Sequence, residues 1–60
     1  MDQGEAMDIA KEIVRDMGRR APQYMVDQIQ AAIRSGRSES ELKQLKQRLD
    51  WIQRMLDAGI

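Results

Sequence analysis

The sequence predicts an all-α protein, a compact three-helix bundle with helices at residues 4–17, 22–35 and 39–58. Two observations carry this prediction. Apolar residues recur every three or four positions along each stretch, which is the period of an amphipathic helix. Glycine, proline and serine separate the stretches, and the alternating β-branched runs that are typical of strands are missing. We therefore expect residues 1–60 to form a single helical domain.

The first predicted helix, residues 4–17, has an apolar face and an acidic face. The apolar positions are Ala6, Ile9, Ala10, Ile13, Val14 and Met17. The acidic stripe consists of Glu5, Asp8, Glu12 and Asp16. Because carboxylates one helical turn apart diverge from a shared ion, this stripe predicts a solvated face and no metal site. Gly18 is expected to end the helix in the left-handed conformation.

The second predicted helix, residues 22–35, begins at a proline. Pro22 has the fixed φ that suits a first helical position, and it favours an extended conformation at Ala21. The predicted inward stripe consists of Met25, Val26, Ile29, Ala32 and Ile33. Gly36 follows the last helical residue and predicts the end of the helix.

The third predicted helix, residues 39–58, starts with a capping box. The Ser38 hydroxyl is expected to accept from the Glu41 amide while the Glu41 carboxylate accepts from the Ser38 amide. Large aliphatic residues then recur at spacings that alternate between three and four. They form a seam of Leu42, Leu45, Leu49, Ile52 and Leu56. Gly59 and Ile60 are expected to close the helix.

The size and composition of the chain predict a thin core that would gain from association. A domain of this length buries only about 60% of the surface that its unfolded chain exposes. The sequence contains no cysteine and no histidine, so a disulfide and the common zinc ligands are excluded. A second subunit is the remaining means of stabilisation. We therefore expect that the chain forms a homodimer through the third helix.

Several classes of function are not expected. Without histidine or cysteine, the candidate nucleophiles are serines, which are better explained as turn and cap residues. No glycine-rich phosphate loop is present, and we predict no enzyme activity, cofactor, metal or small-molecule substrate. The charged residues of the first helix exclude a signal peptide or membrane span there. Because the chain lacks cysteine, we expect a cytoplasmic protein.

A second apolar strip on the third helix is the main candidate site. Trp51 and Met55 lie one turn apart and outside the leucine seam, and Arg48 continues the strip. Tyr24 lies off the inward stripe of the second helix. One interpretation places Trp51 and Met55 in the core of the chain itself. The other makes Trp51, Met55, Arg48 and Tyr24 a dimer or partner interface, because Trp, Tyr, Met and Arg are common interface anchors.

The sequence thus favours a small regulatory, adaptor or inhibitor protein that binds a protein partner, or itself, through the third helix. The alternative is a small nucleic-acid-binding protein. It would use the basic surface of the third helix and the turn before it, formed by Arg34, Arg37, Lys43 and Lys46. The net charge of zero argues against this alternative, because dedicated nucleic-acid binders are usually strongly basic.

Overall fold

The computed structural model describes residues 3–59, which are all-α as predicted and contain no strand. Helix α1 spans Gln3–Met17, the short 3-10 helix η1 spans Gly18–Arg20, α2 spans Ala21–Arg34 and α3 spans Glu39–Asp57. The predicted helix bounds agree with these to within one residue. However, no coil residue separates α1, η1 and α2, so the described residues form two uninterrupted helical stretches, 3–34 and 39–57. The prediction of a bundle of three separate helices is corrected on this point.

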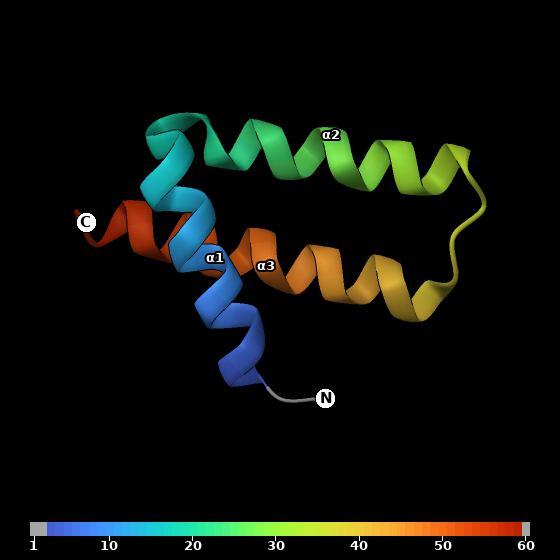
Figure 1. Cartoon of the computed structure of the whole chain (residues 1–60), viewed down its shortest axis with the longest axis horizontal. Helices are drawn as coiled ribbons and strands as arrows, with labels where there is room; N and C mark the ends of the chain where they lie inside the picture. The colour runs from blue at the N-terminus through green and yellow to red at the C-terminus, as the bar shows by residue number, and fades with distance from the viewer. Residues whose placement is uncertain (1–2, 60) are drawn as a thin grey trace.

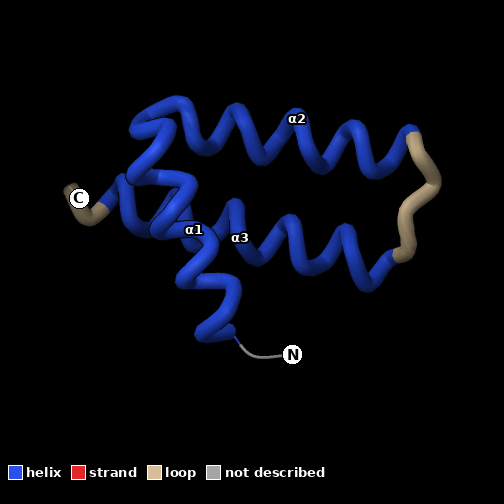
Figure 2. Tube along the Cα trace, viewed as in Figure 1, coloured by secondary structure: helices blue, strands red, loops and turns tan. Residues whose placement is uncertain are grey.

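The helices are arranged as a hairpin that is covered on one side. Helices α2 and α3 run antiparallel and side by side, and α1 crosses in front of the C-terminal half of α3 (Figure 1). Both α1 and α2 pack mainly against α3 and touch each other much less. Figure 2 shows the resulting asymmetry, because the half of the hairpin next to the 35–38 loop has no third helix beside it.

The junction between α1 and α2 differs from the predicted turn. Gly18 has a φ of +60°, as expected for a residue that closes a helix. Ala21, however, is helical, with φ −56° and ψ −43°, and the expectation of an extended conformation is wrong. The restriction that proline imposes on the preceding residue is only a preference, and the burial of Ala21 in the core outweighs it. Pro22 fits the first turn of α2, where an amide donor has no helical partner.

The loop between α2 and α3 is built from local backbone bonds. Gly36 has a φ of +73°, and the amide of Arg37 donates to the carbonyl of Ala32 at 3.0 Å, which is a Schellman ending. The Ser38 hydroxyl accepts from the Glu41 amide at 3.3 Å, so the predicted cap is confirmed. The reciprocal half of the capping box is wrong, because the Glu41 carboxylate accepts from the Arg37 guanidinium at 3.4 Å instead.

The core cluster lies where α1 crosses the hairpin and consists of Ala10, Ala21, Met25, Ile52 and Met55. Among the described residues, the buried apolar side chains are Ala6, Ala10, Ala21, Met25, Ala32, Ile52 and Met55. Only Met25 and Ile52 are large and fully buried. The four leucines of the predicted seam are half-buried, and Leu45, Leu49 and Leu56 pack against the cluster. Alanine therefore makes up much of the buried set, and the leucines lie around it.

The closing residues of α3 were predicted in part. Gly59 has a φ of +83°, and its amide donates to the carbonyl of Leu56 at 3.1 Å. Ile60, the other member of the expected closing pair, lies outside the described residues.

Candidate functional site

The strip predicted to contact a partner is largely used by the chain itself. Met55 is only 7% exposed and belongs to the core cluster, so the expectation that it enters a partner's groove does not fit the structure. Trp51 and Tyr24 are half-buried against this core, and Arg48 is half-buried as well. The Arg54 guanidinium carbon lies 5.5 Å from the centroid of the Trp51 ring, a cation–π distance. The strip therefore offers little free apolar surface.

The four residues of the alternative nucleic-acid site do not form one patch. Arg34, Arg37, Lys43 and Lys46 are all exposed and lie near the 35–38 loop. Arg34 follows the buried Met25 by nine residues, and Lys43 precedes the buried Ile52 by nine. At about 100° per residue, each points away from the hairpin interior, in opposite directions. Arg37 forms an exposed ion pair with Glu41 at 3.4 Å.

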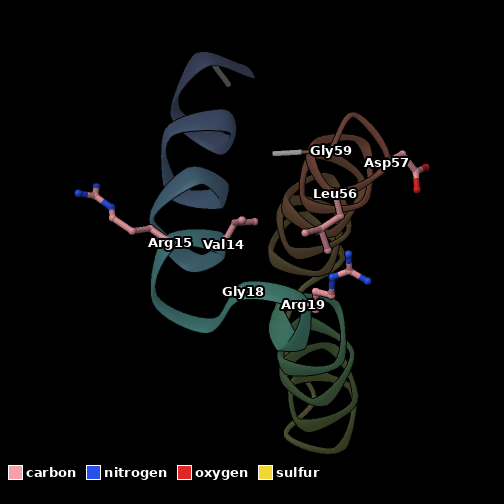
Figure 3. A pocket seen from close by; sticks show the side chains of 7 residues that line it. All are labelled: Val14, Arg15, Gly18, Arg19, Leu56, Asp57 and Gly59. Atoms are coloured by element: carbon pink, nitrogen blue, oxygen red, sulfur yellow. The ribbon is translucent and has the colours of Figure 1, made fainter.

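A hollow of about 570 Å³ lies between the end of α1, η1 and the end of α3. Its lining residues are Val14, Arg15, Gly18, Arg19, Leu56, Asp57 and Gly59. Figure 3 shows Val14 and Leu56 directed between the helices, whereas the charged ends of Arg15 and Asp57 point away from each other. Because these charged groups do not converge, the hollow lacks the few convergent polar groups that fix a small ligand.

One side of the hairpin carries apolar side chains that are not covered. Met55 shares the lining of a small hollow with Lys11 and Val14 of α1, so the Met55 side of α3 faces α1. At about 100° per residue, Leu42 and Leu49 lie about 140° and 120° around α3 from Met55. These two leucines therefore lie on the side of the hairpin away from α1.

The same side of α2 is also apolar. Gln28 and Ala31 line a hollow together with Glu41, which lies only about 40° around α3 from Met55. The flank of α2 that contains Gln28 and Ala31 therefore faces the α1 side of the hairpin. On the other flank, away from α1, α2 carries Val26, Ile29 and Ile33. We call the surface formed by these three residues with Leu42 and Leu49 the far face.

The far face is incompletely buried. Ile33 is 58% exposed, and Val26, Ile29, Leu42 and Leu49 are half-buried. Of these five residues, only Leu49 packs against the core cluster. The hydrophobic periodicity of α2 predicts that Val26, Ile29 and Ile33 face the core. The structure instead centres the buried stripe on Met25 and Ala32, which turns the other three toward the flank.

The far face was missed because two apolar stripes overlap on α2. One runs through Ala21, Met25 and Ala32, and the other through Val26, Ile29 and Ile33. The signal that distinguishes them is residue size. Alanine permits the close helix contact at the centre, and the β-branched stripe then falls at the edge. Alanine spacing therefore indicates the centre of the contact better than total hydrophobicity does.

Comparison with family models, with curated proteins and with solved structures finds no match for this chain. No helix in the described part of the chain is both long and apolar enough to cross a membrane. Within residues 3–59, no three acidic side chains are grouped so that they would hold a metal ion.

Proposed function

We propose that this chain is a small, non-enzymatic protein–protein interaction module that binds through the far face, to which α3 contributes Leu42 and Leu49. It acts as a regulatory, adaptor or inhibitor protein, and its association with a partner or with itself, and its cytoplasmic location, are parts of this proposal. The observation that supports it most directly is Ile33, which is 58% exposed beside four half-buried aliphatic residues. Contiguous apolar surface of this kind marks contact sites.

The core of the chain supports the same function. Within the described part of the chain, four of the seven buried apolar residues are alanine, whereas all four leucines are incompletely buried. Each aliphatic side chain that a partner fully covers contributes about 1.5–3 kcal/mol relative to full exposure, and proportionally less when it is already half-buried. A partner on the far face therefore contributes the burial that the chain does not supply alone.

The far face is a better contact surface than the strip that contains Trp51. The Trp51 ring is half-buried and lies near the Arg54 guanidinium, and Met55 is inside the core. Ile33 and Leu42 have no contact with the core cluster, so a partner reaches them without rearrangement of the chain. The proposed partner surface is therefore the far face, which lies on the opposite side of α3 from the predicted strip.

Photo-crosslinking in cells that express the chain tests this function. A benzophenone amino acid replaces either Ile33 on the far face or Ala31 on the opposite flank of α2. Both positions are exposed and lie on the same helix, so they are matched in accessibility. We expect protein adducts, including adducts with a second copy, at position 33 and far fewer at position 31. Equal yields at the two positions, or no adduct at position 33, would contradict the proposal.

A binding measurement tests the nucleic-acid alternative. We expect no measurable shift in the fluorescence anisotropy of a labelled duplex at physiological salt, because Arg34 and Lys43 diverge. Salt-sensitive binding that is lost on changing Arg34 or Lys43 to glutamine would support nucleic acid instead.

A further inference from the structure

We infer that the partner on the far face is a second copy of this chain, packed face to face with its long axis antiparallel about a two-fold axis. This inference rests on the proposed function, because it names the partner of the same surface. Three features of the molecule carry it: the distribution of charge along the long axis, the order of residues across the face, and the size of the face.

Charge is divided between the two ends of the hairpin. Residues 30–48, at the loop end, carry five basic and two acidic side chains, a net charge of +3. Residues 18–29 and 49–59, at the opposite end of the hairpin, carry three basic and three acidic side chains and no net charge. Figure 1 shows the loop end and this end at opposite ends of the long axis, which measures 34 Å. The net charge of −2 on residues 3–17 belongs to α1, on the side of the hairpin away from the far face.

This division selects the antiparallel arrangement. When two copies meet face to face with reversed axes, the positive loop end of each lies over the end of the other hairpin that carries no net charge. The parallel arrangement places two loop ends, each of net charge +3, against one another. The apolar surface provides the affinity in either arrangement, and the charge distribution decides the orientation.

The residue order along the face fits the same symmetry. The far-face residues of α2 are centred near Ile29, and Leu42 and Leu49 on α3 are centred near position 45. A two-fold axis that crosses the hairpin at this level places Leu42 of one copy opposite Leu49 of the other. It also places Ile33 opposite Val26 and brings the two Ile29 side chains close together. Each large residue near the loop end thus meets an apolar residue of the second copy.

The face is large enough for a dimer of modest stability. Two packed helices present a surface about 20 Å wide, and α3 is about 28 Å long at about 1.5 Å per residue. The face therefore covers nearly 600 Å² per copy in projection, or about 1,100–1,200 Å² in total. This lies at the lower limit of the range for stable specific interfaces, about 1,200–2,000 Å². The full length of the face is needed, which excludes a contact through the loop end alone.

Sedimentation equilibrium of the full chain, from micromolar to near-millimolar concentration, is the first test. We expect a monomer–dimer equilibrium whose dissociation constant rises by at least about tenfold in Ile33→Glu and changes little in Ala31→Glu. The two variants place the same charge on opposite flanks of the same helix, and helicity by circular dichroism confirms that both are folded. A wild-type chain that remains monomeric, or a dimer that persists in Ile33→Glu, overturns the inference.

Single cysteines test the orientation, because the natural chain has none. Under mild oxidation, Ile29→Cys is expected to form disulfide-linked dimers rapidly, since the two-fold axis passes near this position. Ile33→Cys is expected to cross-link with Val26→Cys in a mixture more readily than with itself. Ala31→Cys, on the opposite flank, is the accessibility control. Self-linkage of Ile33→Cys that matches or exceeds that of Ile29→Cys overturns the antiparallel arrangement.

Salt gives a second measure of orientation. In the antiparallel dimer, raising the salt concentration to about 0.5 M changes association little, because the two positive loop ends do not meet. Association that strengthens with salt overturns the inference by indicating like ends in contact.

The outcomes of the cross-linking and sedimentation experiments distinguish the dimer from the proposed function. A monomeric chain whose residue 33 cross-links only to other proteins overturns the dimer and leaves the proposed function standing, whereas absence of adducts at position 33 overturns both.

Discussion

Replacing Ile52 with alanine tests which residues form the core. Ile52 is 0% exposed and, among the residues that the structure describes, is one of two large side chains that are completely buried. The change removes three buried carbon atoms, at about 0.8 kcal/mol each, and leaves a cavity that raises the loss to about 3–4 kcal/mol. The matched change is Leu42→Ala, at a half-buried position without contact with the core cluster. We expect it to cost less than about 1 kcal/mol.

Urea unfolding followed by far-ultraviolet circular dichroism measures both losses. A chain of this length is expected to have a free energy of unfolding of about 3–9 kcal/mol, so Ile52→Ala removes at least about a third of it. Ile52→Val, at a cost of about 1 kcal/mol, keeps the chain folded. It measures the loss in free energy of unfolding for a smaller truncation at the same position. The measurement is made at low micromolar concentration, where the inferred dimer is dissociated.

A loss of stability in Leu42→Ala as large as that in Ile52→Ala at low concentration would contradict this assignment of the core. That result would mean that the leucine seam, and not the alanine-lined crossing, supplies the stability of the monomer. If the far face is an interface, the cost of Leu42→Ala instead grows with protein concentration, because folding and association are then coupled. Ile52→Ala shows no such growth, since Ile52 is fully buried in a single copy.

Three further changes test local features of the fold. Ser38→Ala removes the acceptor for the Glu41 amide and is expected to lower the free energy of unfolding by about 1 kcal/mol in urea titrations, whereas Ser40→Ala changes it little. Gly36→Ala forces a side chain into φ +73° and is expected to cost about 1–2 kcal/mol by the same measurement, although the space around it is open. Arg54→Ala removes the cation beside the Trp51 ring and is expected to alter tryptophan emission while stability falls by less than about 1 kcal/mol.

The local signals in the sequence predicted the helices well. Gly18, Gly36 and Gly59 all adopt positive φ, and Ser38 caps α3, because each of these features depends on residues within one or two turns. The helix bounds follow from the same local chemistry. The failures at Ala21 and at the Glu41 carboxylate arise where another partner competes, the core in one case and Arg37 in the other.

Nonlocal features were harder to predict. Periodicity identifies a face on each helix but not the helix that covers it, so Met55 was open to two interpretations and the structure places it in the core. The spacing of the leucine seam predicts a packing surface on α3 but does not say which of its residues lie at the centre of the contact. The far face depends on where α1 crosses α3, because that crossing decides which side of the hairpin is covered.

The alanine core and the exposed aliphatic face have a common physical origin. Alanine fills much of the buried interior, and among residues 4–59 only two large side chains, Met25 and Ile52, are fully buried. The larger aliphatic side chains must then lie at the flanks, and α1 covers only one side of the hairpin (Figure 2). Filling the crossing with leucine would force the helices apart and cost stability through overpacking. The chain therefore buries enough to fold by a small margin, and burial of the far face by a second copy links its stability to its own concentration.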